Sequence, residues 1–244
     1  MFKKIYSVAV LFAVATLLAA CEKNYEYIGA YNTDLQTKAN VKFINLNVGS
    51  LRNTLTLNNV LVSRTVISYL GTYPQLSSYA VVDPGNVAVL IKDTLITTTQ
   101  PSINLTLPTT ANSFYTVFTY DTLNNTKAKL VSDNFTVPAD TAIMLRFANF
   151  FFTTVPVANI DVYSWRAGTN IATNIPLNEV TTFTSHLYRT DTLYFRLTGV
   201  TSGELIKYFY SGLTSKRAYT VATRGRYQNT TGTAARGVSL FTNY

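Results

Sequence analysis

Two segments of the chain carry the same order of apolar and polar residues at a nearly constant offset. Residues 41–45 read Val-Lys-Phe-Ile-Asn, and residues 145–149, 104 positions later, read Leu-Arg-Phe-Ala-Asn. The same offset relates Tyr-Thr-Val at 115–117 to Tyr-Thr-Val at 219–221. An offset that is kept over most of 100 residues is typical of a duplicated unit.

Two further matches between these segments show that the offset drifts and then returns. Residues 55–57 match 160–162 at an offset of 105, and residues 87–91 match 193–197 at 106. Small differences in loop length between two copies explain such a drift. The sequence therefore predicts two tandem domains, at residues 39–138 and 139–244.

Each copy is predicted to be a small antiparallel β-sandwich. Tyr (17) and Phe (14) are abundant, and these residues favour strands. Strand-like runs recur every 8 to 12 residues with turn residues between them, and a copy of about 100 residues is the size of one sandwich. The expected fold class is all-β, with two tandem immunoglobulin-like sandwiches. Strands are expected at 40–47, 53–62, 65–70, 77–82, 86–92, 102–107, 113–121, 127–135, 142–150, 158–165, 171–175, 180–187, 192–198, 205–210, 217–226 and 236–243.

The N-terminal segment has the pattern of a secretory signal peptide. Lys3 and Lys4 precede an apolar run of about 16 residues, which is shorter than the roughly 20 needed to span a membrane. The run ends in Leu-Ala-Ala-Cys at 18–21, which resembles the bacterial lipobox, and Cys21 is the chain's one cysteine. We therefore expect a signal peptide at 1–20 and a lipidated tether at 21–38. An ordinary signal peptide with an incidental cysteine is the alternative.

The residues after Cys21 bear on where the protein is placed. Glu22 and Glu26 follow the cysteine closely, which resembles the surface-export signal of Bacteroidetes lipoproteins. The expected location is the outer membrane, held by the lipid on Cys21. The cell surface is favoured over the periplasmic face, which stays open as an alternative.

Several segments of the first copy resemble one family. They are the opening Val-Lys-Phe-Ile-Asn at 41–45, Leu-Thr-Leu-Asn-Asn at 55–59, the Pro-Gly turn at 84–85 leading into Val-Ala-Val-Leu-Ile, and Phe-Tyr-Thr-Val-Phe at 114–118. Together they resemble the DUF4397 domain, over residues 39 to about 244. The resemblance implies a secreted or lipid-anchored bacterial protein with tandem domains, and it implies no established activity. The second copy departs from the pattern because it lacks the Pro-Gly turn.

Residues suited to catalysis or metal binding are scarce. The chain has one His, His186, and one Cys, so multi-His and disulfide-based sites are excluded. No Gly-x-Ser-x-Gly elbow frames a serine, although a site built from His186 with Asp161 or Asp191 is formally available. We therefore expect no catalytic residues, no metal and no cofactor, and no binding of nucleic acid.

Candidate ligand-binding residues lie in the second copy. Trp165 is placed at a hairpin tip between Tyr163 and Arg166, where an exposed ring could stack on a sugar face. After Glu204 there are no acidic residues, and strand alternation puts Arg224 and Arg226 on one face, where they could contact an anionic glycan. A solvated basic surface and ordinary packing of aromatic rings are the alternatives.

These observations lead to three functional hypotheses. The first is a non-catalytic, lipid-anchored envelope protein that binds or scaffolds a glycan or protein partner through its sandwich surfaces. The second is an accessory glycan-binding surface lipoprotein of a nutrient-uptake system. The third is a hydrolase, which requires either His186 within about 3.2 Å of a nucleophile or two carboxylates close together in a pocket.

Overall fold

The computed structural model of the chain describes residues 35–134, 136 and 141–244. The expected signal peptide, Cys21, most of the tether and the expected boundary at 138/139 lie outside these residues. Two short 3-10 helices, η2 (Leu35–Thr37) and η3 (Leu123–Asn125), accompany the strands. No helix within the described ranges has the length and apolar character needed to cross a membrane.

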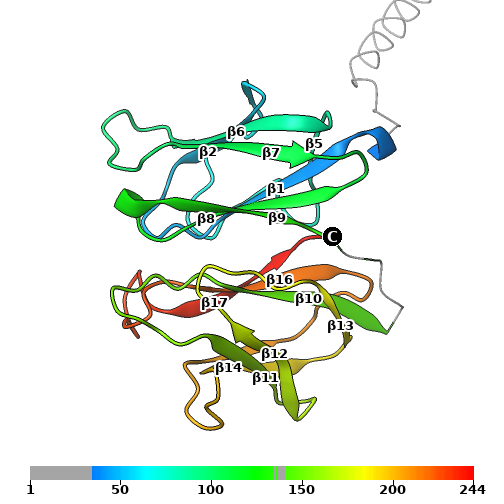
Figure 1. Cartoon of the computed structure of the whole chain (residues 1–244), viewed down its shortest axis with the longest axis vertical. Helices are drawn as coiled ribbons and strands as arrows, with labels where there is room; N and C mark the ends of the chain where they lie inside the picture. Colours follow the sequence, from blue (N-terminus) through cyan, green and yellow to red (C-terminus); the bar gives the residue numbers. More distant parts are fainter. Residues whose placement is uncertain (1–34, 135, 137–140) are drawn as a thin grey trace, which may run out of the picture. The chain divides into compact units, whose positions relative to one another are not determined.

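The first half of the described chain forms two sheets (Figure 1). Sheet 1 has the order β4-β1-β8-β9, with β5 also paired to β1, and sheet 2 has the order β3-β2-β6-β7. The strands are β1 (Ala39–Asn45), β2 (Asn53–Leu57), β3 (Val60–Leu61), β4 (Thr72–Tyr73), β5 (Ala80–Val82), β6 (Gly85–Asp93), β7 (Ile103–Thr109), β8 (Phe114–Tyr120) and β9 (Lys127–Ser132).

The second half forms two sheets with the corresponding order. Sheet 3 is β13-β10-β16-β17, and sheet 4 is β12-β11-β14-β15. The strands are β10 (Ala142–Asn149), β11 (Ile160–Ser164), β12 (Thr169–Ile175), β13 (Thr184–Leu187), β14 (Asp191–Leu197), β15 (Ile206–Tyr210), β16 (Ala218–Arg224) and β17 (Gly237–Thr242).

Each half encloses its own apolar core between its two sheets. In the first half Val41 and Val117 of sheet 1 pack with Val89 of sheet 2. In the second half Leu145 of sheet 3 packs with Phe195 of sheet 4. The expected all-β sandwich class is therefore confirmed.

The strand order within each half differs from the immunoglobulin-like order that we expected. Immunoglobulin constant domains have sheets ABED and CFG. Here each half has a sheet whose two central strands are parallel, β1 with β8 and β10 with β16, while the other pairings are antiparallel. Apolar alternation predicts which face of a strand is buried, but it does not identify the strand's neighbours.

The pairing registers repeat at the offsets read from the sequence. Lys42 lies opposite Thr116 in the first half, and Arg146 lies opposite Thr220 in the second, each shifted by 104. Leu57 pairs with Val89. Val162 lies 105 positions after Leu57, and it pairs in the same way with Phe195, which lies 106 positions after Val89. The sequence matches therefore identify residues in equivalent places of the two halves.

Some expected strands differ from those observed. The run 53–62 is a hairpin of β2 and β3, turning at Asn58 and Asn59, which both have positive φ (47° and 64°), as a type I′ turn requires. The run 65–70 forms no strand and contributes one isolated bridge, from Ile67 to Asn53. The short strand β4 was not expected, because two residues carry no readable alternation.

A third apolar cluster joins the two halves. It contains Ile44, Leu46, Phe118 and Tyr120 from the first half and Ala148, Phe150, Ala222 and Phe241 from the second. Strands β1 and β10 are consequently buried along their whole lengths, one face toward the core of their own half and the other toward this cluster. The two halves thus form part of one compact unit, Gln36–Tyr244.

A buried polar network accompanies this cluster. The Asp133 carboxylate of the first half accepts hydrogen bonds from Arg146 Nη1 (2.5 Å), the Thr116 hydroxyl (2.5 Å) and the Tyr79 hydroxyl (2.7 Å). The Arg146 guanidinium also donates to Thr116 (3.0 Å) and Thr220 (2.7 Å). Burial, with the neighbouring carboxylate of Asp133, raises the pKa of Tyr79 far above its ordinary value. The network places a salt bridge between the halves where water is excluded.

Candidate functional site

The hairpin between β11 and β12 carries three of the residues predicted to bind a ligand. Its turn is shaped by the carboxylate of Asp191, which accepts hydrogen bonds from the Ser164 hydroxyl and from the backbone N–H groups of Arg166 (3.0 Å) and Thr192 (2.6 Å). Trp165 begins the turn and is 62% exposed. The predicted position of Trp165 at a hairpin tip is therefore confirmed.

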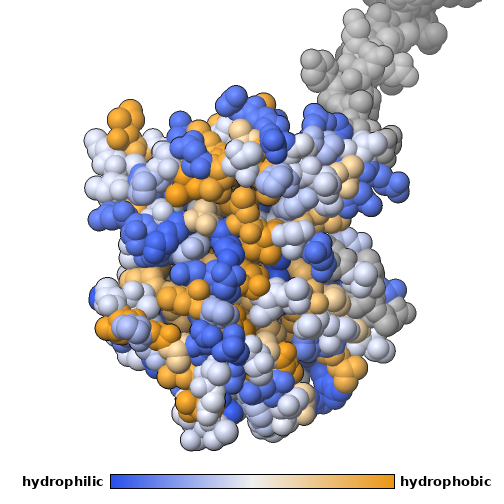
Figure 2. All heavy atoms as spheres, in the orientation of Figure 1, coloured by the Kyte–Doolittle hydropathy of each residue, from blue (hydrophilic) through white to orange (hydrophobic). Residues whose placement is uncertain are grey.

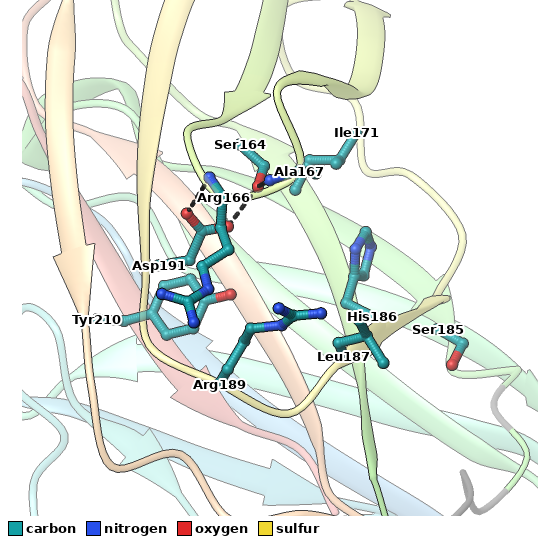
Figure 3. A pocket seen from close by; sticks show the side chains of 10 residues that line it. All are labelled: Ser164, Arg166, Ala167, Ile171, Ser185, His186, Leu187, Arg189, Asp191 and Tyr210. Carbon is teal, nitrogen blue, oxygen red and sulfur yellow. Dashed lines mark hydrogen bonds between the residues drawn. The ribbon is translucent and has the colours of Figure 1, made fainter.

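Trp165 and Arg166 belong to different faces of sheet 4. The backbone N–H of Trp165 donates to the Thr192 carbonyl (3.0 Å), which continues the β11–β14 ladder. Alternation from Tyr163 then places Trp165 on the outer face of the sheet. Arg166 instead lines a pocket on the inner side, next to Tyr210 (Figure 3). The expected cooperation of the Trp165 ring and the Arg166 guanidinium on one ligand is not supported by this placement.

The pocket beside Arg166 has a volume of about 220 Å³. Figure 3 shows the Arg166 side chain beside the Tyr210 ring and Arg189 extending toward His186. Neither arginine forms an ion pair within the ranges that the structure describes. Burial raises the pKa of Tyr210 to about 12, so its hydroxyl stays protonated at neutral pH.

Within the described residues His186 has a hydroxyl neighbour but no carboxylate hydrogen-bonded to its ring. Its Nε2 lies 2.8 Å from the Thr184 hydroxyl, within the distance that the hydrolase hypothesis requires. Burial lowers the pKa of His186, and the nearby charge of Asp191 partly opposes this. In the described part of the chain no carboxylate hydrogen-bonds to the imidazole, so the base has no orienting acid. The Thr184 hydroxyl also lies 3.3 Å from the Leu145 carbonyl, as expected for a hydroxyl bonded within the sheet.

Arg224 and Arg226 lie far from the hairpin. Arg224 donates from Nε to the Ser239 hydroxyl (2.8 Å) and from Nη1 to the Tyr69 hydroxyl of the first half (3.4 Å). Strand β16 ends at Arg224, and Gly225 follows with a φ of +78°, so the alternation predicted to align Arg224 with Arg226 stops there. Arg224 thus bridges the halves.

The two predicted groups lie at opposite ends of the second half. Leu187, which lines the pocket, pairs with Ala142 at the start of β10. Arg224 ends β16, which runs parallel to β10, and pairs with Gly237. The eight residues of β10 span roughly 25 Å. The structure therefore does not combine the predicted residues into a single site.

The outer surface of sheet 4 joins the predicted candidate Tyr163 to residues that the sequence reasoning did not select. We call this surface the aromatic face and define it by Tyr163, Tyr194, Arg196, Lys207 and Phe209. In β14 the core residues Leu193 and Phe195 alternate with Tyr194 and Arg196, which leaves the latter pair on the outside. Cross-strand pairing places Tyr163 opposite Tyr194, and Tyr194 opposite Lys207.

Cations pack against the rings of the aromatic face. The Arg196 guanidinium lies 4.5 Å from the centre of the Tyr163 ring and 5.3 Å from that of Tyr194. The Lys207 ammonium group lies 5.7 Å from the Tyr194 ring. Phe209 is 61% exposed and pairs with Thr192 of β14. Trp165 lies opposite the same Thr192, on its other side. Trp165 therefore borders the aromatic face, in the same row as Phe209.

The first half presents no such rings at the equivalent places. Residues 106 positions before Tyr194 and Arg196 are Ala88 and Leu90, on the outer face of sheet 2. Thr106 lies opposite Ala88, as Lys207 lies opposite Tyr194. Aligning the two copies would have revealed this contrast, which is the sequence signal that was available for the aromatic face.

Apolar side chains also reach the surface elsewhere. On the side drawn in Figure 2 they are scattered among hydrophilic residues over both halves. Ile96, in the loop between β6 and β7, is 99% exposed. Among the described residues, no group of three His, Cys, Asp or Glu side chains could hold a metal ion.

Comparisons with known proteins add no identification. No protein-family model matches the chain, and a search of curated proteins finds no match. The function is therefore inferred from the geometry of the second half.

Proposed function

We propose that this chain is a non-catalytic lipoprotein of the cell envelope, whose second half binds a ligand or partner. The observation that supports it is the difference between equivalent faces. An outer sheet surface needs no aromatic residues for folding, since Ala88 and Leu90 occupy it in the first half. Tyr194, with Arg196 beside it, is therefore available for contact with another molecule.

The anchor in this proposal is the lipid on Cys21, in the outer membrane and on the cell surface. The Leu-Ala-Ala-Cys motif and the acidic residues after it support this placement. The tandem DUF4397-like arrangement is part of the same proposal, supported by the repeated pairing registers.

The anchor is tested by replacing Cys21. We expect Cys21→Ala to move the protein from the membrane fraction to the soluble fraction after cell lysis, because the acyl chains are the anchor. A His186→Ala variant serves as the control and should stay with the membrane. Sedimentation of Cys21→Ala with the membranes would contradict the proposed anchor. Protease treatment of whole cells then separates the surface location, in which the protein is digested, from the periplasmic one.

A glycan is the partner that the exposed rings favour, in line with an accessory glycan-binding lipoprotein of a nutrient-uptake system. Flat aromatic rings with polar edges suit the apolar faces and hydroxyl rims of sugars. We expect Trp165→Ala to keep the fold and to reduce retention of the protein on a glycan array. Ile96→Ala, which removes an even more exposed apolar side chain from the first half, should leave retention unchanged. An unaltered array profile for Trp165→Ala would exclude this ring from glycan contact.

A further inference from the structure

Two cations, Arg196 and Lys207, belong to the aromatic face. Arg196 and Lys207 form no ion pair within the described ranges, although each packs on a tyrosine ring. The Arg196 Nε atom is buried and has no hydrogen-bond partner. The forked end of a guanidinium that forms no ion pair is suited to a planar anion such as a carboxylate.

Asp161, the acidic residue paired across the strands with Arg196, does not satisfy these cations. Its carboxylate accepts hydrogen bonds from the backbone N–H of Asn174 (2.7 Å) and from the Thr198 hydroxyl (2.9 Å), with Gly199 N–H at 3.4 Å. It is 6% exposed and holds the neighbouring turns together. The positive charge on the outside of sheet 4 is therefore available to a ligand.

The geometry of the strands arranges these groups as a grid. One row across the sheet contains Trp165, Thr192 and Phe209, and the next contains Tyr163, Tyr194 and Lys207. Adjacent strands lie about 4.8 Å apart, and successive outward residues along a strand lie about 7 Å apart. Rings therefore occupy two neighbouring rows, with Lys207 at the end of the second row and Arg196 in the row after it, and this spread suits an extended chain of sugars better than a single small molecule.

We propose that the aromatic face binds an acidic polysaccharide, a chain of sugars that carry carboxylates. In this arrangement the exposed rings of Trp165 and Phe209 contact the apolar faces of the sugars, and the rings of Tyr163 and Tyr194 hold the two cations in place. Arg196 and Lys207 bind the carboxylates. The inference deepens the proposed function, on which it rests, by assigning the ligand class and the residues that recognise it.

The first half supplies the test variants. Tyr194→Ala and Arg196→Leu install the residues that stand at the equivalent places, Ala88 and Leu90, so the sandwich is expected to tolerate them. Lys207→Thr likewise installs the residue of the first half, since Thr106 stands at the equivalent place. Lys207 is exposed, so this change does not put folding at risk. Far-UV circular dichroism and the thermal unfolding midpoint verify that each variant is folded.

The experiment is a calorimetric titration of the full-length protein in detergent micelles. A hexamer of galacturonate is the acidic probe, and maltohexaose is the neutral probe. We expect the galacturonate hexamer to bind, high salt to weaken it, and the neutral hexamer to bind at least about tenfold more weakly. Each of Tyr194→Ala, Arg196→Leu and Lys207→Thr should raise the Kd for the acidic hexamer about tenfold.

Lys92→Leu is the matched control, because it removes one exposed cation from the outer face of sheet 2. It should leave the Kd unchanged. The proposal is overturned by absence of binding to the galacturonate hexamer, by equal binding of both hexamers, or by variants of the aromatic face that bind like the unaltered protein.

The same titration separates this inference from the function on which it rests. Mass analysis of the recovered hexamer shows whether it was cleaved. Cleavage would overturn the non-catalytic function while the binding face stands, and intact but unbound hexamer would overturn the binding face alone.

Discussion

Arg146 and Asp133 form an ion pair between the halves, with side-chain exposures of 1% and 0%. Removing two charges from water is costly, and here the cost is offset by hydrogen bonds that satisfy both groups. Loss of one partner would leave the other charge buried and unpaired. Removing one member of the pair is therefore expected to lower the free energy of unfolding more than replacing both members together.

We predict that Arg146→Met lowers the free energy of unfolding by about 3–5 kcal/mol, because Asp133 is left unpaired. Adding Asp133→Asn to this variant should restore part of the loss, giving a double variant less destabilised than the sum of the singles. Urea denaturation measures both effects. Asp83→Asn, which breaks the exposed pair of Lys38 and Asp83, should cost less than about 1 kcal/mol. Equal costs for the two broken pairs would contradict the argument.

Lys42 occupies the place in the first half that Arg146 occupies in the second, but its charged group has different hydrogen-bond partners. Its ammonium group donates to the backbone carbonyls of Leu76 and Ser78. Burial lowers its pKa from 10.5 to about 8, and the charge of Asp133 partly opposes this. Between these pH values the unfolded chain binds more protons, so the contribution of Lys42 to the free energy of unfolding rises with pH.

We predict that Lys42→Met removes this pH dependence. The free energy of unfolding of the unaltered protein, minus that of the variant, should grow by about 2 kcal/mol between about pH 8 and about pH 10. Chemical denaturation across this range measures the difference. Parallel curves for the two proteins would show that Lys42 stays charged in the folded state.

At the scale of elements, strands were predictable where alternation or turn residues mark them. The asparagines at 58 and 59 marked the β2–β3 hairpin because they accept positive φ. The pairing of β1 with β8 was not predictable, because it joins segments about 74 residues apart. Each half is built on such a long-range pairing.

The candidate site was predictable to the same extent. Trp165 could be placed at a hairpin tip from local sequence. The aromatic face depends on which strands lie next to β14, and the Arg146–Asp133 pair depends on contact between the two halves. Neither relation is expressed in the spacing of residues along one strand.

Gly225 directly follows β16, at a place where the backbone passes close to another segment. Its φ is +78°, and a Cβ atom there would lie 2.1 Å from the Ala235 carbonyl oxygen. Gly232 has a similar φ of +85°, but a Cβ there meets nothing within 4 Å. The two glycines therefore differ in the available space while sharing the backbone conformation.

We predict that Gly232→Ala costs about 1–2 kcal/mol of unfolding free energy, from the left-handed conformation alone. Gly225→Ala should cost more than this, because residues 234–235 must also move away from β16. Thermal and urea denaturation of the two variants give the comparison. Equal losses of unfolding free energy in the two variants would show that residues 234–235 move away from β16 at no energetic cost.

At the scale of the whole molecule, the shared cluster decides whether the halves unfold separately. Each half has its own core, but Phe150 of the second half is 1% exposed and packs against rings of the first. Its ring centre lies 4.7 Å from that of Tyr120 and 5.1 Å from that of Phe118. We infer that the two cores are coupled through this contact, so that the unaltered protein unfolds in a single transition.

We predict that Phe150→Ala lowers the free energy of unfolding by roughly 3–5 kcal/mol and separates the single calorimetric transition into two. The reason is that the variant removes contact between the halves while leaving both cores intact. Phe209→Ala, which removes an aromatic ring that is 61% exposed, should change stability by less than about 0.5 kcal/mol. A single transition in Phe150→Ala, shifted as a whole, would mean that the halves stay coupled without this ring, and the coupling would then rest on the buried pair of Arg146 and Asp133.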